Sequence, residues 1–345
     1  VKLEDFGTGH HYRVKNVYVH HLCGMLKNSG SGENLLPAKK TGGIQFRVTR
    51  DNETATRKGR PTNFKDVVVE NSEIFHVDLV GLSTWSDWMC RDISPPCKDY
   101  KPYSNGRRAV TAESASDYFP SEGIVFRNNK IHGTGGDGVI VRASTDAQVV
   151  ANLVYDVWMR APGNSAGLWI INSDGAMVQY NEVHKVRQQI AKGDGNAFDA
   201  DMGARNTTFQ YNYSHDNAGG LMLFCGCGGN ELGKTAQSVG TKVKDNLSVN
   251  DKRRIFFLAG STDSEATGNT VVIDARDNTP LVEVGSQSNA VRFSGNKFYN
   301  FSGAGEYYFN VAGAVDYRKL SWDRNLFFGF LVPGGANPGV NGTNV

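Results

Sequence analysis

The stretches Gln179-Tyr180-Asn181-Glu182-Val183 and Gln210-Tyr211-Asn212-Tyr213-Ser214 decide the fold, because each sets an asparagine between two short runs typical of β-strands. The same pattern recurs around Asn16, Asn71, Asn129, Asn152, Asn246, Asn269, Asn296 and Asn325. From Asn129 onward the asparagines are 23 to 34 residues apart, a spacing typical of repeats that stack into a solenoid.

An asparagine at the same corner of every coil can stack its amide on the amides of the coils above and below. It also tolerates the left-handed backbone that a sharp corner requires. The repeat therefore predicts an all-β chain, a single right-handed parallel β-helix (solenoid) of about ten coils.

A glycine followed by a short apolar strand gives the expected register of one face. These glycines are Gly43, Gly81, Gly138, Gly167, Gly195 and Gly220. Strand alternation points the first and third residues after each glycine inward. We therefore expect Leu168 and Ile170, Asn196 and Phe198, and Leu221 and Leu223 to face the core.

The spacing of Asn16, Asn71 and Asn129 is about twice that of the later asparagines, which indicates long loop insertions in the N-terminal third. The stretches 24–42, 50–61 and 86–120 are rich in Gly, Ser, Pro, Lys and Arg and are predicted to be these loops. We expect one β-helix domain over 1–332 and a flexible tail over 333–345. Cys90 and Cys97 bracket a Pro-Pro loop and are expected to form a disulfide.

Composition excludes several classes of protein. Of the 345 residues, 39% are hydrophobic and 21% charged, which is typical of a globular protein. The net charge of +2 gives no basic surface for nucleic acid, and no apolar run approaches the ~20 residues of a membrane span. The chain opens on Val1-Lys2-Leu3, so we expect a leader or a cap to precede it. We expect a secreted, extracellular monomer.

One coil carries three carboxylates, Asp194, Asp199 and Asp201. By the register above, Asp199 and Asp201 both face outward, about 7 Å apart. Two carboxyls that close raise each other's pKa, so that one can donate a proton while the other attacks or activates water, as glycoside cleavage requires. The trio could instead bind Ca²⁺, or be a turn and a solvated face. We expect no other metal or cofactor.

Several neighbours are candidates for binding a sugar. Trp169 is expected in the same outward column as Ala197, as a platform for a pyranose ring. Trp85 and Arg142 are expected in the column of Asp199.

Two further residues, His215 and Asp216, follow the next asparagine and could orient a hydroxyl or a carboxylate. His132, His184 and His215 each stand three residues after an asparagine, however, and this regularity favours a structural role for all three.

The run from Asp194-Gly195 through Asp201, followed by Asn206-Thr207-Thr208-Phe209 and His215-Asp216-Asn217, resembles the secreted bacterial β-helix glycosidases of the lacto-N-biosidase type (glycoside hydrolase family 136). The resemblance is concentrated in about residues 120–230. It implies a retaining exo-glycosidase whose catalytic pair is two aspartates seven residues apart. Asp194 and Asp201 match that spacing, with Asp201 as nucleophile, Asp194 as acid/base and Asp199 tuning or binding. Lys192 and the run 226–229 have no counterpart in the pattern.

The residues thus favour Asp199 with Asp201, whereas the resemblance favours Asp194 with Asp201. A polysaccharide lyase or epimerase acting on a uronate-containing glycan is the alternative enzyme, since Arg142 or Lys192 could serve its chemistry. A non-catalytic carbohydrate-binding β-helix is the third hypothesis. All three take an oligosaccharide or polysaccharide as partner.

Overall fold

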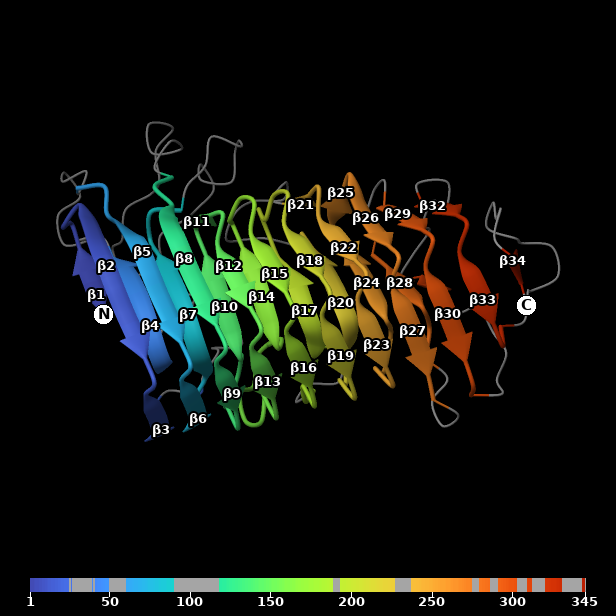
Figure 1. The fold of residues 1–345 in the computed structure, drawn as a ribbon, viewed down its shortest axis with the longest axis horizontal. Helices are drawn as coiled ribbons and strands as arrows, with labels where there is room; N and C mark the ends of the chain where they lie inside the picture. Colours follow the sequence, from blue (N-terminus) through green and yellow to red (C-terminus); the bar gives the residue numbers. More distant parts are fainter. Residues whose placement is uncertain are drawn as a thin grey trace.

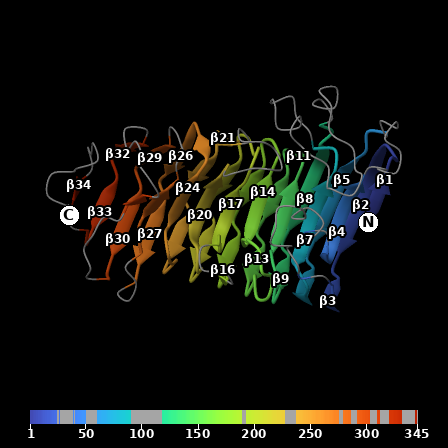
Figure 2. The same cartoon turned by 180° about the vertical axis from the view of Figure 1, so that it is seen from behind.

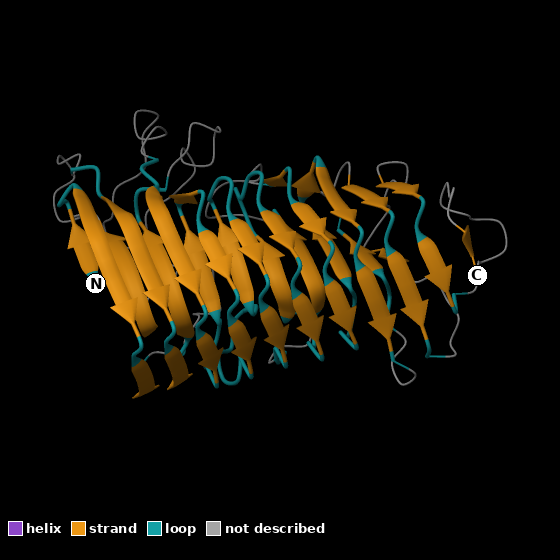
Figure 3. Ribbon diagram, in the orientation of Figure 1, coloured by secondary structure: helices purple, strands orange, loops and turns teal. Residues whose placement is uncertain are grey.

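The computed structural model is a parallel β-helix whose coils stack along the long axis, from the N-terminal strands at one end to the C-terminal strands at the other (Figure 1). It describes residues 1–24, 26, 39, 41–49, 60–89, 118–188, 193–226, 237–274, 279–285, 291–302, 309–311, 320–330 and 343–344. These residues form strands and connecting turns, without a helix (Figure 3). No helix among them therefore has the length and apolar character needed to cross a membrane.

Three parallel sheets run the length of the solenoid, and the chain visits them in the order A, B, C in each coil (Figures 1 and 2). Sheet A contains β1 (Lys2–Glu4), β4 (Gly42–Thr49), β7 (Val80–Ser86), β10 (Val139–Arg142), β14 (Leu168–Ile171), β17 (Asn196–Ala200), β20 (Gly220–Cys225), β24 (Phe256–Ala259), β28 (Val282–Val284) and β31 (Phe309–Val311).

Sheet B contains β2 (Thr8–Lys15), β5 (Asn63–Glu70), β8 (Ser121–Arg127), β12 (Gln148–Val150), β15 (Met177–Gln179), β18 (Thr208–Gln210), β22 (Lys242–Lys244), β26 (Ser264–Thr267), β29 (Val291–Ser294) and β32 (Leu320–Asp323), with β11 (Ser144–Thr145) paired to β8. Two further short strands, β21 (Ser238–Val239) and β25 (Ser261–Thr262), pair with each other.

Sheet C contains β3 (Tyr18–Leu22), β6 (Glu73–Val77), β9 (Lys130–His132), β13 (Leu153–Tyr155), β16 (Glu182–His184), β19 (Tyr213–His215), β23 (Leu247–Val249), β27 (Thr270–Ile273), β30 (Lys297–Asn300), β33 (Leu326–Phe328) and β34 (Thr343–Asn344). Each sheet thus has ten or eleven strands, and the predicted β-helix of about ten coils is confirmed.

The predicted asparagine ladder lies at the corner between sheets B and C. In Asn129, Asn152, Asn181, Asn212, Asn246, Asn269 and Asn296, the side-chain Nδ2 donates to Oδ1 of the next asparagine at 2.8–3.0 Å, and the run ends at Asn325. The same Oδ1 also accepts the backbone N–H of the preceding asparagine, as in Asn181 N to Asn212 Oδ1 at 2.9 Å. Each amide is therefore satisfied without water, and the ladder fixes the rise from coil to coil.

Two predicted members of the ladder, Asn16 and Asn71, are not part of it. Both are exposed and occupy the left-handed corner position one residue earlier, with φ of 56° and 53°. In the coil of Asn71, the next residue, Ser72, takes the ladder position, and its backbone N–H donates to Asn129 Oδ1 at 3.1 Å. Tyr180 and Tyr211 hold the same left-handed position in later coils. The left-handed backbone and the stacked amide thus belong to adjacent residues, not to one.

Some expectations concern residues outside those the structure describes. They include Cys90 and Cys97, most of the loops in 24–42, 50–61 and 86–120, and almost all of the tail over 333–345. Their disulfide, conformation and mobility stay predictions.

We predict that Asn212→Leu destabilises the fold by about 3 kcal/mol or more. The change leaves the N–H and Nδ2 of Asn181, and the carbonyl of Val178, without their buried partners. Urea unfolding against wild type measures the loss. Lys244→Ala, on a partly exposed position of the neighbouring strand, is the control and should cost less than 1 kcal/mol. Equal stability of the two variants would contradict a structural role for the ladder.

Candidate active site

The register of sheet A differs from the predicted one at the acidic coil. A Cβ added to Gly43, Gly81 or Gly138 would meet the carbonyl of the next glycine at 2.4–2.7 Å, so close stacking explains glycine at these positions and at Gly167. After Gly167 the column continues through Ala197, whose carbonyl lies 2.6 Å from the equivalent Cβ. Gly195 therefore stands two residues before the column, and Gly220 one residue before Leu221.

This shift changes which residues share the core face. Phe198 pairs with Leu168 and Met222, and Ala200 pairs with Ile170 and Phe224. Phe198 and Ala200 belong to the main core, so Asp199 and Asp201 face outward, as predicted. The expected inward position of Leu223 is wrong, since Leu223 packs in a separate small cluster with Cys225 and Ala259.

The outward neighbours of the carboxylates are corrected in the same way. Asp199 pairs with Trp169 in the preceding coil, so Trp169 does not share a column with Ala197. Ile170 pairs with Ala200, so the next residue, Ile171, stands level with Asp201. On its other side, Ile171 pairs with Arg142. Arg142 and Trp85, which stand level with each other in neighbouring coils, therefore belong to the column of Asp201 and not to that of Asp199. The Arg142 guanidinium lies over the Trp85 ring at 4.1 Å.

Asp194 and Asp201 flank the five-residue strand β17 at the centre of sheet A. Burial raises the pKa of Asp194 to about 6, and the negative charge of Asp201 adds to the rise. The positive charges of Arg254 and Lys39 oppose it. Asp194 is therefore an acid that holds its proton close to neutral pH, with the second carboxylate near enough to influence it.

Asp201 is half-buried, like Asp194, and its partial removal from water raises its pKa, but it has more groups that favour the ionised form. Met202 donates its backbone N–H to Asp201 Oδ1 at 2.6 Å, and the Cys225 side chain provides a second hydrogen bond. The charges of Lys39 and Arg142 act in the same direction. The two carboxyls thus stand in different electrostatic surroundings.

Lys39 joins a second buried carboxylate to the site. Its Nζ donates to Asp137 Oδ2 at 2.5 Å and to the Asn164 carbonyl at 2.7 Å, and it lies 5.2 Å from the Trp169 ring centroid. Asp137 Oδ1 accepts the Trp169 Nε1–H at 3.0 Å and the Ala166 N–H at 3.1 Å. This network fixes the position of a cation that acts on both Asp194 and Asp201.

Trp169 and Trp85 are walls of the site, not open platforms. Trp169 is 7% exposed and packs in a cluster with Trp158 and Ile171, while Trp85 is 2% exposed beneath Arg142. Arg142 is also 2% exposed and contacts the sulfur of Met89. An open stacking surface is therefore not what these rings provide in this structure.

His215 and Asp216 are not brought to the acidic coil. His215 ends β19 on sheet C and stacks on His184, with ring centroids 4.4 Å apart. His132, Tyr155 and His184 extend the same stack, with centroids 4.7 and 5.0 Å apart. The predicted structural role of the three histidines agrees with this stack, which lies on a different sheet from Asp201.

Four residues of the site were not predicted from the sequence: Lys39, Asp137, Cys225 and Arg254. Asp137-Gly138 repeats the dipeptide Asp194-Gly195, and this was the one signal that could have identified Asp137. Arg254 is fully buried over the Phe257 ring and lies 3.5 Å from Glu283. Nothing in the sequence places Lys39 or Arg254 near an aspartate two or more coils away.

The charges around the trio suit acid–base chemistry better than a calcium ion. Lys39, Arg142 and Arg254 already supply positive charge to Asp194 and Asp201. Among the described residues, the side chains close enough to share a metal ion are on sheet C. The arrangement at β17 provides two carboxyls with raised pKa values that can exchange protons with a bound molecule.

Comparisons with known proteins agree with this architecture. The family model described as "Right handed beta helix region" matches residues 98–271, about half of the chain. The lacto-N-biosidase of glycoside hydrolase family 136 from Eubacterium ramulus superposes with a TM-score of 0.61 at 21% identity, over 85% of this chain and 43% of that one. No curated protein matches the sequence.

Two other solved structures share the fold. The N-terminal fragment of gene product 12 of bacteriophage Phi29 gives a TM-score of 0.52 at 12% identity, over 99% of this chain and 56% of that one. A mutant DFA-IIIase from Arthrobacter chlorophenolicus in complex with DFA-III gives 0.50 at 10% identity, over 97% and 69%. The predicted likeness to the lacto-N-biosidase type is confirmed for the fold, and this chain spans less than half the length of that enzyme.

The raised pKa of Asp194 predicts a pH-dependent cost in stability. Its pKa is about 6 when folded and about 3.9 when unfolded, so the folded state binds the proton more tightly. Stability from this group is greatest below pH ~4 and is lost as the pH rises toward 6. At pH 7.5, the free energy of unfolding of Asp194→Asn should therefore exceed that of wild type by on the order of 2 kcal/mol. At pH 4 the variant should be no more stable than wild type.

Asp263→Asn, at an exposed carboxyl, is the control for this experiment and should change stability little at either pH. An Asp194→Asn variant that is less stable than wild type at pH 7.5 would contradict the burial of this carboxyl.

Proposed function

The chain belongs to the family of right-handed β-helix proteins, and from that premise we propose that it is a glycoside hydrolase acting on an oligo- or polysaccharide by a retaining, two-carboxylate mechanism. The observation that carries the proposal is the pair Asp194 and Asp201, one on each side of β17 at the centre of sheet A, each with a pKa raised by its removal from water. Glycoside hydrolases need one carboxyl that is protonated and one that is ionised at the same pH.

The surroundings of the two carboxyls assign their roles. Asp194, with a pKa of about 6, acts as the acid/base and gives its proton to the leaving oxygen as the glycosidic bond breaks. Asp201, which accepts the Met202 N–H and lies near Arg142 and Lys39, acts as the nucleophile and forms a bond to the anomeric carbon. Water then displaces Asp201, giving a proton to Asp194, so both carboxyls return to their starting states.

Asp199 supports the pair from between them. It is buried on β17 next to Trp169, one strand position away from the two core residues Phe198 and Ala200. We assign it to tuning or to binding a sugar hydroxyl. Retention requires the Asp194 and Asp201 carboxyls to lie about 5–5.5 Å apart around the substrate.

The similarity to a lacto-N-biosidase supports a glycan as the substrate class, and secretion and a monomeric state are part of the same proposal. Cleavage is tested by incubating the protein with nitrophenyl glycosides and a panel of glycans. New reducing ends are expected. An unsaturated product that absorbs in the ultraviolet would instead identify a lyase. If neither product forms, the chain would be a carbohydrate-binding β-helix.

Two variants separate the roles of the carboxyls. Asp201→Asn should abolish turnover of every substrate, by 10³-fold or more, because no leaving group replaces a missing nucleophile. Asp194→Asn should be milder on nitrophenyl glycosides, whose leaving group needs no proton, and azide should restore part of its activity.

Asp199→Asn is the matched control on the same strand and should retain measurable turnover. Wild-type activity in Asp201→Asn would refute the mechanism. Loss in Asp199→Asn with full activity in Asp194→Asn would transfer the role of second carboxyl to Asp199.

The pH–rate profile gives an independent check on the acid. Because Asp194 must be protonated to donate, kcat/KM should fall about tenfold per pH unit above its pKa of about 6. This alkaline limb should disappear in Asp194→Asn assayed on a nitrophenyl glycoside. A limb that persists unchanged in the variant would assign the acid to another group.

A further inference from the structure

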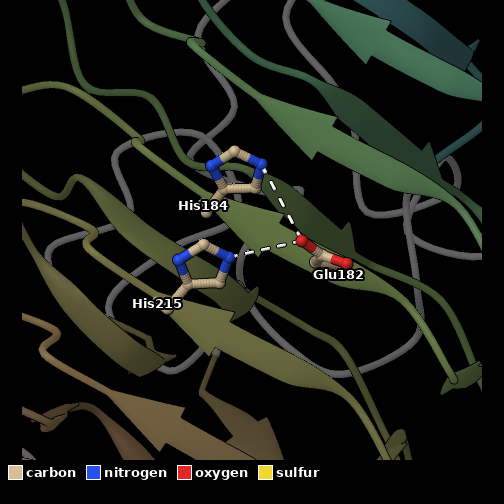
Figure 4. A group of neighbouring side chains, drawn as sticks. All are labelled: Glu182, His184 and His215. Carbon is tan, nitrogen blue, oxygen red and sulfur yellow. Dashed lines mark hydrogen bonds and ion pairs between the residues drawn. The ribbon is translucent and has the colours of Figure 1, made fainter.

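We propose that Glu182, His184 and His215 form a binding site for a divalent transition-metal ion of the Zn²⁺ class on sheet C, independent of the acidic coil. Figure 4 shows both imidazoles directed at the same carboxylate. The Nε2 atoms of His215 and His184 lie 3.3 and 3.9 Å from Glu182 Oε1, and the three atoms all lie within 4.8 Å of one another.

The ladder places these three side chains on one face. Glu182 and His184 are two residues apart on β16, so they point to the same side, and His184 pairs with His215 on β19. The stacked amides of Asn181 and Asn212 lie immediately before these strands and fix their positions. The ligand atoms are therefore held by rigid backbone.

His215 has a carboxylate on each side of its ring. Nδ1 lies 2.8 Å from Asp216 Oδ2, Asp216 is itself held by Asn250 at 2.5 Å, and Nε2 lies 3.3 Å from Glu182 Oε1. In the tautomer whose Nδ1 donates to Asp216, Nε2 carries the lone pair that a metal ion would accept in place of the contact with Glu182. A carboxylate that orients a histidine in this way is the usual second partner of a metal-binding imidazole.

His184 directs a second ring nitrogen, Nε2, at the same carboxylate oxygen. Its Nδ1 is buried and makes no hydrogen bond within the described part of the chain. The two rings are stacked 11° from parallel, so a cation bound by both nitrogens and the Glu182 oxygen requires the rings to rotate toward it.

An equivalent carboxylate elsewhere on sheet C shows how the same conflict is resolved without a metal. Glu73 Oε1 lies 2.9 Å from His132 Nε2 and 2.8 Å from Lys130 Nζ. Strand pairing sets Lys130, Leu153, Glu182 and Tyr213 side by side in one row across sheet C. The neighbours of Glu182 in this row are therefore Leu153 and Tyr213. The lysine cation that neutralises Glu73 therefore has no counterpart beside Glu182 in this row.

The ligand set and spacing select the ion. Two imidazole nitrogens and one carboxylate oxygen suit Zn²⁺, Ni²⁺ and Cu²⁺ and not Ca²⁺, which takes oxygen ligands. Tetrahedral zinc with bonds of about 2.0–2.1 Å places neighbouring ligand atoms about 3.3 Å apart. The His215 distance already matches, and the Glu182 side chain is 46% exposed and can turn toward His184.

The test is calorimetric titration of the tag-free full chain with ZnCl₂ at pH 7.5, together with the visible spectrum of its Co²⁺ form. Wild type should bind one equivalent at this site and gain thermal stability. His184→Gln, His215→Gln and Glu182→Gln should each weaken this binding at least tenfold and reduce the tetrahedral Co²⁺ absorption.

His132→Gln is the matched control, because it removes a ring of the same stack and a histidine paired with a glutamate. It should bind Zn²⁺ like wild type even if it is less stable. Absence of saturable binding to wild type would overturn the proposal. So would binding that is equal in wild type and in the three variants, or that is lost equally in His132→Gln.

Discussion

The coil-to-coil hydrogen bonding of the buried asparagines is the constraint on which the rest of the structure depends. A parallel stack of short strands contains many turns, and each turn risks leaving polar backbone groups buried without partners. The ladder from Asn129 to Asn325 satisfies the corner in every coil, since each Oδ1 accepts two hydrogen bonds from the coil before it. With the corner fixed, the three sheets keep one register, and side chains far apart in sequence become neighbours along the axis.

The acidic coil uses this rigidity for chemistry. Asp194 and Asp201 stand at the two ends of β17, where buried cations from other coils act on them: Lys39 on both, Arg254 on Asp194 and Arg142 on Asp201. In water these carboxyls would ionise at ordinary pH. Partial removal from water raises their pKa values, and the uneven distribution of positive charge gives the two carboxyls different surroundings. The fold therefore supplies two environments for the same functional group within one strand.

The fold could be predicted from the sequence because the asparagine of the ladder recurs between two short strand-like runs. The outward direction of Asp199 and Asp201 could be predicted as well. The side chains that neighbour these aspartates along the axis could not be predicted, because the glycines of the different coils do not all hold the same position. Gly195 stands two residues out of register, and Ala197 takes the stacked position instead, so Trp169 lies beside Asp199, and Arg142 lies two coils away in the column of Asp201. Lys39 lies in an inserted segment without a repeat, so its contact with Asp137 depends on tertiary structure alone.

Asp194 and Asp201 interact electrostatically across β17. The most direct measurement of this interaction is the ¹³C NMR titration of the Asp194 carboxyl in wild type and in Asp201→Asn, with Asp194→Asn used for assignment. The account predicts a pKa of about 6 in wild type and a lower pKa in Asp201→Asn, because the charge of Asp201 contributes to the rise. An Asp194 that titrates near pH 4 in wild type, or whose pKa is the same in both proteins, would contradict it.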